Sequence, residues 1–535
     1  MQTQQNVPIE LKFHASKKRA DPFNYVELDA IVTEPDGVER RVPGFWAGGD
    51  TWKLRLCGST LGRHTWRTQC SDATDRGLHN QTGQFEVVSY ERGNPLYKHG
   101  PLRVSANRRY LEHADGTPFF WLGDTWWLAM CNRLPYLDAF AELLDNRKQR
   151  GFSVIQIVAG LYPDQAFGDP RNASDSGFAW QGEFETINPA FFDEADQKLQ
   201  AIIDASLCPC IFGCWGYYLP MMGPRKMRQH WRYLVARYGA WPVTFCLAGE
   251  GEMPWYLCDD LERDRQLLRR GWTQIAAYVR SINGYQRLIT MHPTTAGRKQ
   301  IEDPALLDFD MLQTGHNGYP ALENNVRRIT EGRAAEPTMP VVVGELNYEG
   351  IMATSGPDMQ HHAVWASLLS GAAGFTYGAN GIWQFNELGQ PPYISPGGAT
   401  WGGAPWREAM PWRGAAEVGM TREVLAPFDW SKFEPINDWF TPAGTFTAGI
   451  PDKVRVTYIP ATAFWSKPWT LRRLPPQSKW RVFLVNPSYG AEVELDPIVA
   501  DRASVVVTGP SREHVAPIIR DWLLIAEAAD GSARA

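Results

Sequence analysis

Eight short apolar segments recur between residues 99 and 436, and helical segments separate most of them. Apolar runs of this length that alternate with helices are typical of parallel strands, which are buried on both faces. The eight predicted strands are Phe119–Asp124, Val154–Val158, Cys210–Trp215, Val243–Leu247, Leu288–Met291, Phe309–Gln313, Val341–Val343 and Gly374–Tyr377. The predicted helices are Pro135–Arg150, Phe191–Ala205, Arg225–Tyr238, Asp260–Ile282 and Asp358–Leu369. Eight such units in one block predict a closed (β/α)8 barrel, the TIM-barrel fold.

The two ends of the chain carry a different pattern, of short β-type runs separated by turns. Residues 1–98 contain runs such as Tyr25–Val32 and Thr51–Leu56 and a turn signal at Pro35-Asp-Gly37, which together predict an immunoglobulin-like β-sandwich. The last hundred residues return to short strands such as Trp480–Val485 and predict a second, smaller β-sandwich. We therefore expect a multidomain chain, with a β-sandwich at 1–98, the barrel at 99–436 and a β domain at 437–535.

The amino-acid composition indicates which kinds of molecule the protein binds. The 535 residues carry a formal charge of -6 and include 23 Trp and 19 Tyr. A negative balance without a basic run argues against nucleic acid as a partner. Trp and Tyr present flat apolar faces with a polar edge, which pack cores and also stack on sugar rings. A carbohydrate substrate fits this composition, and self-association into a homo-oligomer is compatible with it.

No segment predicts export or a membrane span. The N-terminus, Met-Gln-Thr-Gln-Gln-Asn-Val-Pro, lacks a basic stretch followed by an apolar one. A run of about 18 apolar residues, the length of a membrane-spanning helix, does not occur. We therefore expect a cytoplasmic protein with no membrane partner.

Sequence motifs for metal- and cofactor-dependent chemistry are missing. Cys208, Cys210 and Cys214 are closely spaced, but they lie in a run that predicts a buried strand, and no second half with zinc spacing follows. We expect the eight cysteines to be reduced and mostly buried. There is no G-x-S-x-G, no H-E-x-x-H, no P-loop and no G-x-G-x-x-G after a strand. The sequence predicts neither a metal nor an organic cofactor, and the pair His361-His362, in a predicted helix, is expected to face solvent.

Two glutamates stand at the ends of predicted strands. Glu250 closes the run on strand four, and Glu345 closes the run on strand seven. In a (β/α)8 barrel the carboxyl ends of the strands meet at the face where catalysis takes place. A glycosidase needs one carboxylic acid to protonate the leaving oxygen and one carboxylate to attack the anomeric carbon or activate a water. A single glutamate at a strand end is most often a salt-bridge partner or a helix cap, but two that face one cleft indicate glycoside hydrolysis.

Other strand ends add polar and aromatic side chains to the same face of the predicted barrel. A pocket lined in this way would hydrogen-bond hydroxyl groups and stack on a sugar ring. Taken singly, most of these residues are as readily explained as core or structural residues. The predicted substrate-binding residues are Asp124, Trp126, Trp127, Gln156, Trp215, His292, His316, Asn317, Tyr348, Asn380 and Trp383.

Several stretches resemble known sequences along nearly the whole chain. Val42–Trp46, Thr51–Leu56 and Gly62–Thr68 resemble an N-terminal sandwich domain of unknown function that precedes certain glycosidase barrels. The segments that resemble the barrel and the final β domain of the apiosidase-like glycoside hydrolases are Phe119–Trp126, Val342–Glu349, Ala373–Gln384 and Trp480–Gly490. The resemblance implies a glycosidase barrel followed by a small β domain.

The resemblance also implies roles for the two glutamates. The nucleophile of the family falls on Glu345, in Gly-Glu-Leu-Asn-Tyr-Glu, and its acid/base falls on Glu250. The second match departs from the family pattern, which usually reads Gly-Gly-Asp where this chain has Ala248-Gly-Glu. A glutamate reaches one methylene further and could hold the acid in a different place. The resemblance therefore supports hydrolysis more firmly than it supports apiose as the sugar.

We predict a glycoside hydrolase that acts with retention on a plant or microbial glycan or glycoside, with Glu345 as nucleophile and Glu250 as acid and base. Carboxyls on strands four and seven of such barrels usually lie about 5 Å apart, whereas about 8 Å or more would indicate inversion. One alternative is a glycan-binding protein without turnover, which would hold the carboxylates far apart or in separate salt bridges. Another is a metal-dependent barrel hydrolase, which would need clustered ligands, whereas His292 and His316 are dispersed.

Overall fold

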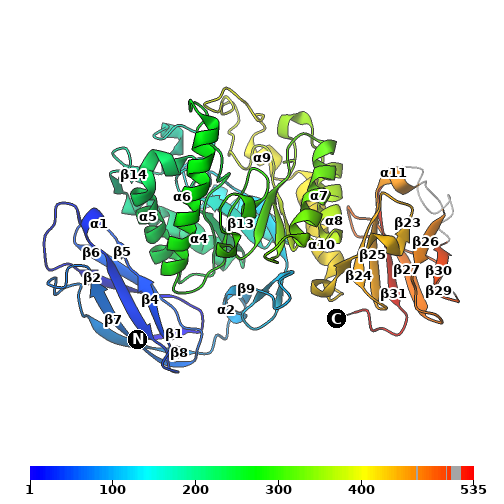
Figure 1. Ribbon diagram of the computed structural model, residues 1–535, viewed down its shortest axis with the longest axis horizontal. Helices are drawn as coiled ribbons and strands as arrows, with labels where there is room; N and C mark the ends of the chain where they lie inside the picture. The colour runs from blue at the N-terminus through cyan, green and yellow to red at the C-terminus, as the bar shows by residue number, and fades with distance from the viewer. Residues whose placement is uncertain (465–467, 502, 508–519, 535) are drawn as a thin grey trace.

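Eight parallel strands form the central sheet of the computed structural model, which describes residues 1–464, 468–501, 503–507 and 520–534 (Figure 1). The strands follow one another around the sheet in chain order, and the first pairs with the last. The two ends of the sheet meet where Thr290 Oγ1 donates a 2.8 Å hydrogen bond to the carbonyl of Phe309. The strands are β12 (Trp121–Thr125), β13 (Val154–Val158), β16 (Cys208–Phe212), β17 (Thr244–Cys246), β18 (Ile289–Thr290), β19 (Asp310–Gln313), β20 (Val341–Glu345) and β21 (Gly374–Tyr377). The predicted barrel is confirmed as a nearly closed one.

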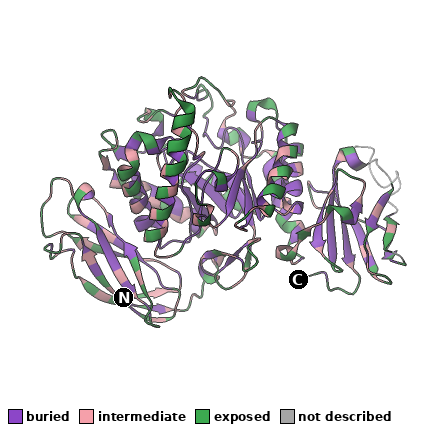
Figure 2. Cartoon of the chain, in the orientation of Figure 1, coloured by how far each residue is buried: buried purple, intermediate pink, exposed green. Residues whose placement is uncertain are grey.

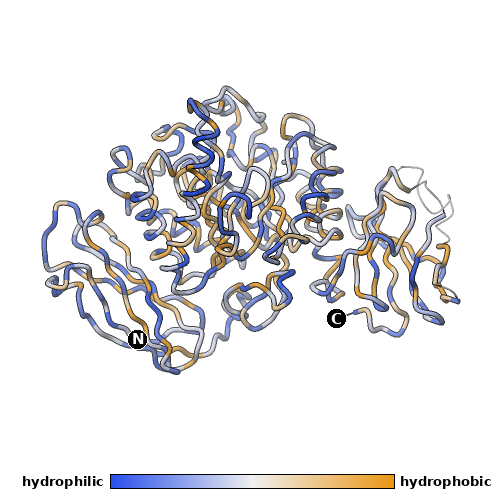
Figure 3. Tube along the Cα trace, in the orientation of Figure 1, coloured by the Kyte–Doolittle hydropathy of each residue, from blue (hydrophilic) through white to orange (hydrophobic). Residues whose placement is uncertain are grey.

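Burial on both faces explains why these strands read as unbroken apolar runs. Every residue of β12, β13, β16 and β20 is buried, because side chains on one face fill the barrel and those on the other pack under the helices. Figure 2 shows buried residues along the central strands and exposed residues on the outer helices. Figure 3 shows that the central strands are mainly hydrophobic and that the outer helices carry many hydrophilic residues.

Helices follow most of the barrel strands, close to where the sequence predicts them. Helix α6 begins after Asp260, whose side chain caps it by accepting from the backbone N–H of Arg263 at 3.0 Å. Between β18 and β19 the connection forms only the short turns η2 (Gly297–Lys299) and η3 (Pro304–Leu306). The helices are α3 (Asp138–Gln149), α4 (Pro189–Asp204), α5 (Tyr218–Tyr238), α6 (Leu261–Ile282), α7 (Tyr319–Ala334), α8 (Pro357–Leu369), α9 (Trp406–Ala409) and α10 (Arg413–Leu425).

The N-terminal region packs two sheets face to face around the buried side chains of residues such as Leu28, Trp52 and Leu54. Arg55 ties this sandwich to the barrel, since it donates to the carbonyl of Arg237 at 2.8 Å and pairs with Asp196. One sheet has the order β1 (Gln2–Gln4), β8 (Thr82–Val88), β7 (Gly62–Cys70), β3 (Leu28–Thr33) and β4 (Glu39–Pro43); the other has β2 (Ile9–His14), β6 (Thr51–Leu56) and β5 (Phe45–Trp46). The helix α2 (Pro95–Lys98) and a small sheet, β9 (Leu102–Val104), β10 (Leu111–His113) and β11 (Pro118–Phe119), lead into the barrel.

The C-terminal region also packs two sheets around its own core, which includes Trp480 and Leu524. The larger sheet contains β22 (Glu434–Pro435), β24 (Phe446–Ile450), β25 (Val454–Ile459), β31 (Trp522–Ala528), β27 (Lys479–Val485), β28 (Glu492–Glu494) and β29 (Ile498–Val499); the smaller contains β23 (Phe440–Thr441), β26 (Trp469–Arg472) and β30 (Ser504–Val507). The barrel lies between the two β-rich regions in Figure 1. The multidomain architecture is thus confirmed, and the boundaries at residues 98 and 436 stay predictions.

Two further sequence expectations concern the cysteines and the membrane. The eight cysteines, which all fall among the described residues, are free, and every one except Cys258 is buried. Within the described parts of the chain, no helix has both the length and the apolar character that crossing a bilayer requires.

Candidate active site

The two predicted glutamates lie at the carboxyl ends of their strands. Glu345 is the last residue of β20, and Glu250 lies in the turn that follows β17. The backbone of Glu250 has φ 44°, a left-handed conformation that is unusual for glutamate and often marks a functional site. A side chain on the preceding Gly249 would lie 2.1 Å from the Trp215 ring, so a glycine is required for this close approach. The turn therefore holds Glu250 in a fixed position beside Trp215.

Gln313 lies between the two carboxyl groups. A register shift between Leu312 and Gln313 places Gln313, the last residue of β19, opposite Glu345. Its amide nitrogen donates to Glu250 Oε1 and to Glu345 Oε1, each at 3.0 Å. These two oxygens are therefore at most about 6 Å apart, and the roughly 120° between the two N–H bonds of one amide brings the separation to about 5 Å.

The surroundings of Glu345 favour its ionised form. His316 Nε2 lies 2.6 Å from Oε1, and the Tyr348 hydroxyl donates to Oε2 at 2.5 Å. His292 Nε2 lies 3.3 Å from the same Oε2. Burial alone would raise the pKa of Glu345, but His292 and His316 outweigh it and hold the pKa well below its usual range. Glu345 is thus a buried carboxylate with donors on both oxygens.

The surroundings of Glu250 have the opposite effect. Besides Gln313, its carboxyl accepts a hydrogen bond from Trp215 Nε1 at 3.2 Å. Burial, followed by repulsion from Glu345, raises the pKa of Glu250 to about 7. One carboxyl of the pair therefore keeps its proton near neutral pH while the other stays ionised, which is the division of roles that acid-assisted nucleophilic chemistry requires.

Both glutamates border one cavity of about 360 Å³ at the mouth of the barrel. Its walls combine aromatic side chains with polar groups, as in sites that bind small organic ligands. The lining residues are Trp127, Pro163, Asp164, Trp215, Glu250, Met253, Tyr256, Thr294, Gln313, His316, Glu345, Tyr348, Ile351, Trp383 and Trp401.

The structure brings seven of the predicted site residues to this cavity and one more directly beneath it. His292 is fully buried and packs edge-on against Trp127, with ring centroids 5.6 Å apart, while it contacts Glu345. The seven that line the cavity are Glu250, Glu345, Trp127, Trp215, His316, Tyr348 and Trp383.

The remaining predicted residues lie outside the cavity. Asp124 is fully buried, where it pairs with Arg147 at 2.6 Å and accepts from Trp126 Nε1 at 2.7 Å. Gln156 is buried and donates to Thr376 Oγ1 at 3.0 Å. Asp124 therefore faces the helix layer, because Arg147 lies on α3, whereas Gln156 lies on the opposite face of the sheet and bonds to β21.

Two predicted site residues on loops also lie outside the cavity. Asn380 is buried and donates to the carbonyl of Trp401 at 2.8 Å, so it supports a lining residue from behind. Asn317 is exposed on the surface between β19 and α7.

Sequence reasoning missed several lining residues, among them Gln313, Asp164, Tyr256 and Trp401. Gln313 could have been found, because it is a polar residue at the end of a predicted strand. Asp164, Tyr256 and Trp401 lie on long loops after β13, β17 and β21, where no periodic pattern places a side chain.

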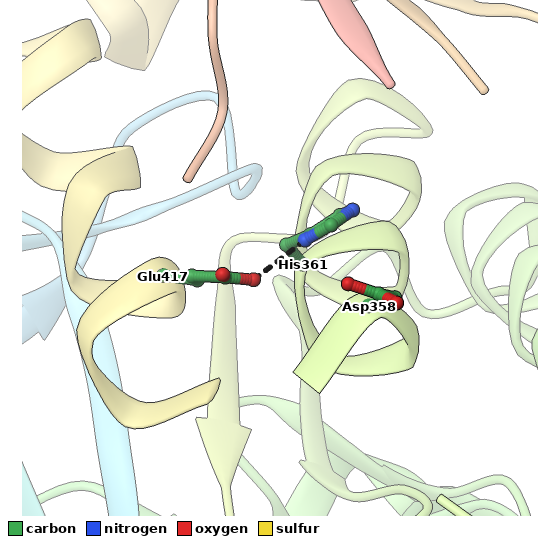
Figure 4. A group of neighbouring side chains, drawn as sticks. All are labelled: Asp358, His361 and Glu417. Carbon is green, nitrogen blue, oxygen red and sulfur yellow. Dashed lines mark hydrogen bonds and ion pairs between the residues drawn. The ribbon is translucent and has the colours of Figure 1, made fainter. Parts of the chain in front are cut away.

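A group of metal-ligand types lies elsewhere, where the barrel meets the C-terminal region. Asp358 and His361 on α8 and Glu417 on α10 approach one another closely (Figure 4). His361 is buried, with Nδ1 2.6 Å from Glu417 and Nε2 2.6 Å from Asp521, just before β31. Arg413 pairs with Asp358 at 2.6 Å and with Glu417 at 2.7 Å. These groups already bond to one another and join the two regions, so the expectation that His361 faces solvent is wrong.

Comparisons with known proteins identify a family and a shared fold. The family described as "Apiosidase-like, catalytic domain" matches residues 105–432, and "Domain of unknown function (DUF5060)" matches residues 2–71. Among solved structures, a glycoside hydrolase is 21% identical, with a TM-score of 0.67, and the match covers 82% of this chain and 99% of the other. A family 5 glycoside hydrolase from Bacteroides vulgatus ATCC 8482 is 20% identical, with a TM-score of 0.67 and coverage of 82% and 96%. At these identities the two structures show a shared fold. None of the curated proteins matches the chain.

Proposed function

The chain belongs to the apiosidase-like catalytic domain family, and from that premise we propose that it hydrolyses a glycosidic bond with retention of anomeric configuration. Membership and the shared fold support glycosidase activity in general. The mechanism and the roles of Glu345 and Glu250 are our proposal.

The observation that carries the proposal is the shared hydrogen-bond donor, Gln313. Because its amide bonds to both carboxyls, their oxygens lie about 5 Å apart, which is the spacing of retaining glycosidases. Inverting enzymes separate the two groups by about 6.5 to 9.5 Å to admit a water between them. The spacing therefore supports direct attack by one carboxylate over activation of a water.

In the first step, Glu345 attacks the anomeric carbon and forms a glycosyl ester. The bond from that carbon to the leaving oxygen breaks, and the oxygen takes the proton of Glu250. In the second step, Glu250, now ionised, takes a proton from a water whose oxygen attacks the anomeric carbon. The ester bond breaks and returns Glu345 as a carboxylate.

The donors around Glu345 fit the role of nucleophile. His316, Tyr348 and Gln313 orient the carboxylate, and His292 and His316 keep it ionised at the pH where Glu250 still carries its proton. The aromatic side chains of the cavity supply faces on which a sugar ring can stack. Apiose is one candidate sugar, and Glu250 in place of the usual aspartate of the family keeps other sugars open.

Sugar release from a panel of branched plant glycans and small glycosides, apiosides included, tests the proposal. The native protein should release one sugar, and Glu345→Gln and Glu250→Gln should each abolish release from unactivated substrates. Asp358→Asn, which changes an exposed carboxylate outside the cavity, serves as the matched control. If the native protein releases nothing from the panel but binds some of its members, the proposal is wrong and a glycan-binding protein is the better description.

A further inference from the structure

A third carboxyl group borders the cavity that holds the two glutamates. Asp164 lies on the loop after β13, and its Oδ1 accepts a short hydrogen bond from the hydroxyl of Tyr256, on the loop after β17. The contact joins two loops that are 92 residues apart in sequence. Neither residue has a part in the bond-breaking steps, so the pair requires a separate explanation.

Asp164 is close enough to the catalytic pair to interact with it. Burial, opposed by the hydrogen bond from Tyr256 and reinforced by repulsion from Glu345, raises the pKa of Asp164 to about 6. Asp164 in turn contributes to the raised pKa of Glu250. The three carboxyl groups therefore interact electrostatically within one cavity.

The charge of the cavity wall restricts what can bind there. Among the described residues that line the cavity there are three carboxyl groups and no lysine or arginine. A sugar that carries a carboxylate would meet like charges, and the one lining group that can carry a positive charge, His316, is already bonded to Glu345, so binding costs free energy. The hydroxyl groups of a neutral sugar are donors, and an aspartate held in place by Tyr256 offers them a charged acceptor.

We propose that Asp164, oriented by Tyr256, is a specificity-determining residue that accepts hydrogen bonds from the hydroxyl groups of a neutral sugar and disfavours an acidic one. The inference rests on the proposed function, because it assigns the cavity to the sugar that is cleaved. It goes beyond that function by naming the group that selects the sugar.

Backbone geometry decides which variants are informative. Asp164 has φ 57°, a left-handed conformation that asparagine tolerates and that is strained for most other residues. Asp164→Asn therefore removes the charge with the least disturbance of the loop. Tyr256→Phe removes the orienting hydroxyl and leaves the carboxyl in place, so it forms the matched second variant.

The experiment measures kcat and KM for the neutral glycoside that the native protein hydrolyses fastest, together with inhibition by galactose and by galacturonic acid. Asp164→Asn should lower kcat/KM by about 10- to 100-fold, chiefly through KM. Tyr256→Phe should lower it by a smaller factor. Galacturonic acid should gain as an inhibitor relative to galactose in Asp164→Asn, a change that a purely structural role would not produce.

The outcomes separate this inference from the proposed function. If the native protein hydrolyses the glycoside and Asp164→Asn, folded with the native melting temperature, matches it in kcat/KM and in inhibitor preference, the inference is overturned and the function stands. If no glycoside is cleaved, titration calorimetry measures whether the native protein and Asp164→Asn bind the neutral oligosaccharides of the panel. If the native protein binds an oligosaccharide and Asp164→Asn weakens that binding, the inference is supported although the proposed function is not. If Asp164→Asn leaves the binding unchanged, or the native protein binds none of the oligosaccharides, the inference is overturned.

Discussion

Replacing Gln313 with methionine should lower kcat/KM and move the alkaline limb of the pH profile to higher pH. Methionine has nearly the length of glutamine but no N–H, so both glutamates lose the donor that they share. Glu345 keeps His316 and Tyr348 as partners, whereas Glu250 keeps Trp215 at 3.2 Å. The perturbation therefore acts mainly on Glu250.

The size of the effect follows from the contacts that are lost. A hydrogen bond to a charged group contributes about 1.5 to 3 kcal/mol, and about 1.4 kcal/mol corresponds to a tenfold change in rate. We expect kcat/KM to fall by about 10- to 100-fold. The hydrogen bond from Gln313 lowers the pKa of Glu250, so its loss raises that pKa above the native value of about 7. Because Glu250 acts in its protonated form, the variant should keep its remaining activity to higher pH than the native protein.

The assay is the pH dependence of kcat/KM for the best glycoside of the panel, which reports groups of the free enzyme. Gln266→Met is the control, because Gln266 is exposed on α6, bonds to Glu262 and is not among the residues that line the cavity. It should match the native protein at every pH. An unchanged kcat/KM for Gln313→Met, or an alkaline limb displaced to lower pH, would refute the argument that Gln313 couples the two carboxyls.

Three other predictions concern the native pH profile, Tyr348 and His361. In the native protein, kcat/KM should fall as pH rises through about 7, where Glu250 loses its proton. It should also fall on the acid side as Asp164, whose pKa is about 6, takes up a proton, whereas Glu345 adds no acid limb there because its pKa is held well below its usual range. An acid limb near pH of about 5 that remains in Asp164→Asn would contradict this. Tyr348→Phe removes a 2.5 Å hydrogen bond to Glu345 and should lower kcat by about tenfold, measured at saturating substrate, whereas an unchanged kcat would show that the hydroxyl is dispensable. The pKa of His361, buried between two carboxylates, is raised from 6.5 to about 9. His361→Gln should therefore lower the free energy of unfolding, and with it the thermal unfolding midpoint, most at pH of about 6, where the ion pairs contribute up to ~3 kcal/mol that disappears as pH rises through about 9. An equal loss of stability below and above pH of about 9 would contradict the ion-pair explanation.

The sequence predicts the barrel well because its strands obey a rule that is local. A parallel strand buried on both faces must be a short apolar run, and eight such runs with helices between them admit few other folds. The connection between β18 and β19 also fits this rule, because the sequence predicts no helix there and the structure has only the short turns η2 and η3. The domain boundaries depend on packing between regions and have no comparable local signal.

The sequence predicts only some of the site residues, because only those at strand ends have a local signal. Residues just past a strand end lie at the mouth of the barrel, and three of them, Glu250, His316 and Tyr348, line the cavity. Trp126 and Asn317 follow strand ends as well but do not line it, because the local turn decides where such a side chain points. A residue within a strand, such as Gln156, can point into the packed interior or towards the helices, and the sequence does not say which. Loop residues such as Asp164 are placed by contacts with other loops, which single-sequence patterns do not encode.

The configuration of the first product tests the central claim most directly. Proton NMR, recorded in the first minutes of hydrolysis before mutarotation, distinguishes the two anomers of the released sugar. The roughly 5 Å between the carboxyls of Glu250 and Glu345 predicts a product with the same anomeric configuration as the substrate. A product of opposite configuration would show that water attacks directly, and would contradict the assignment of Glu345 as nucleophile.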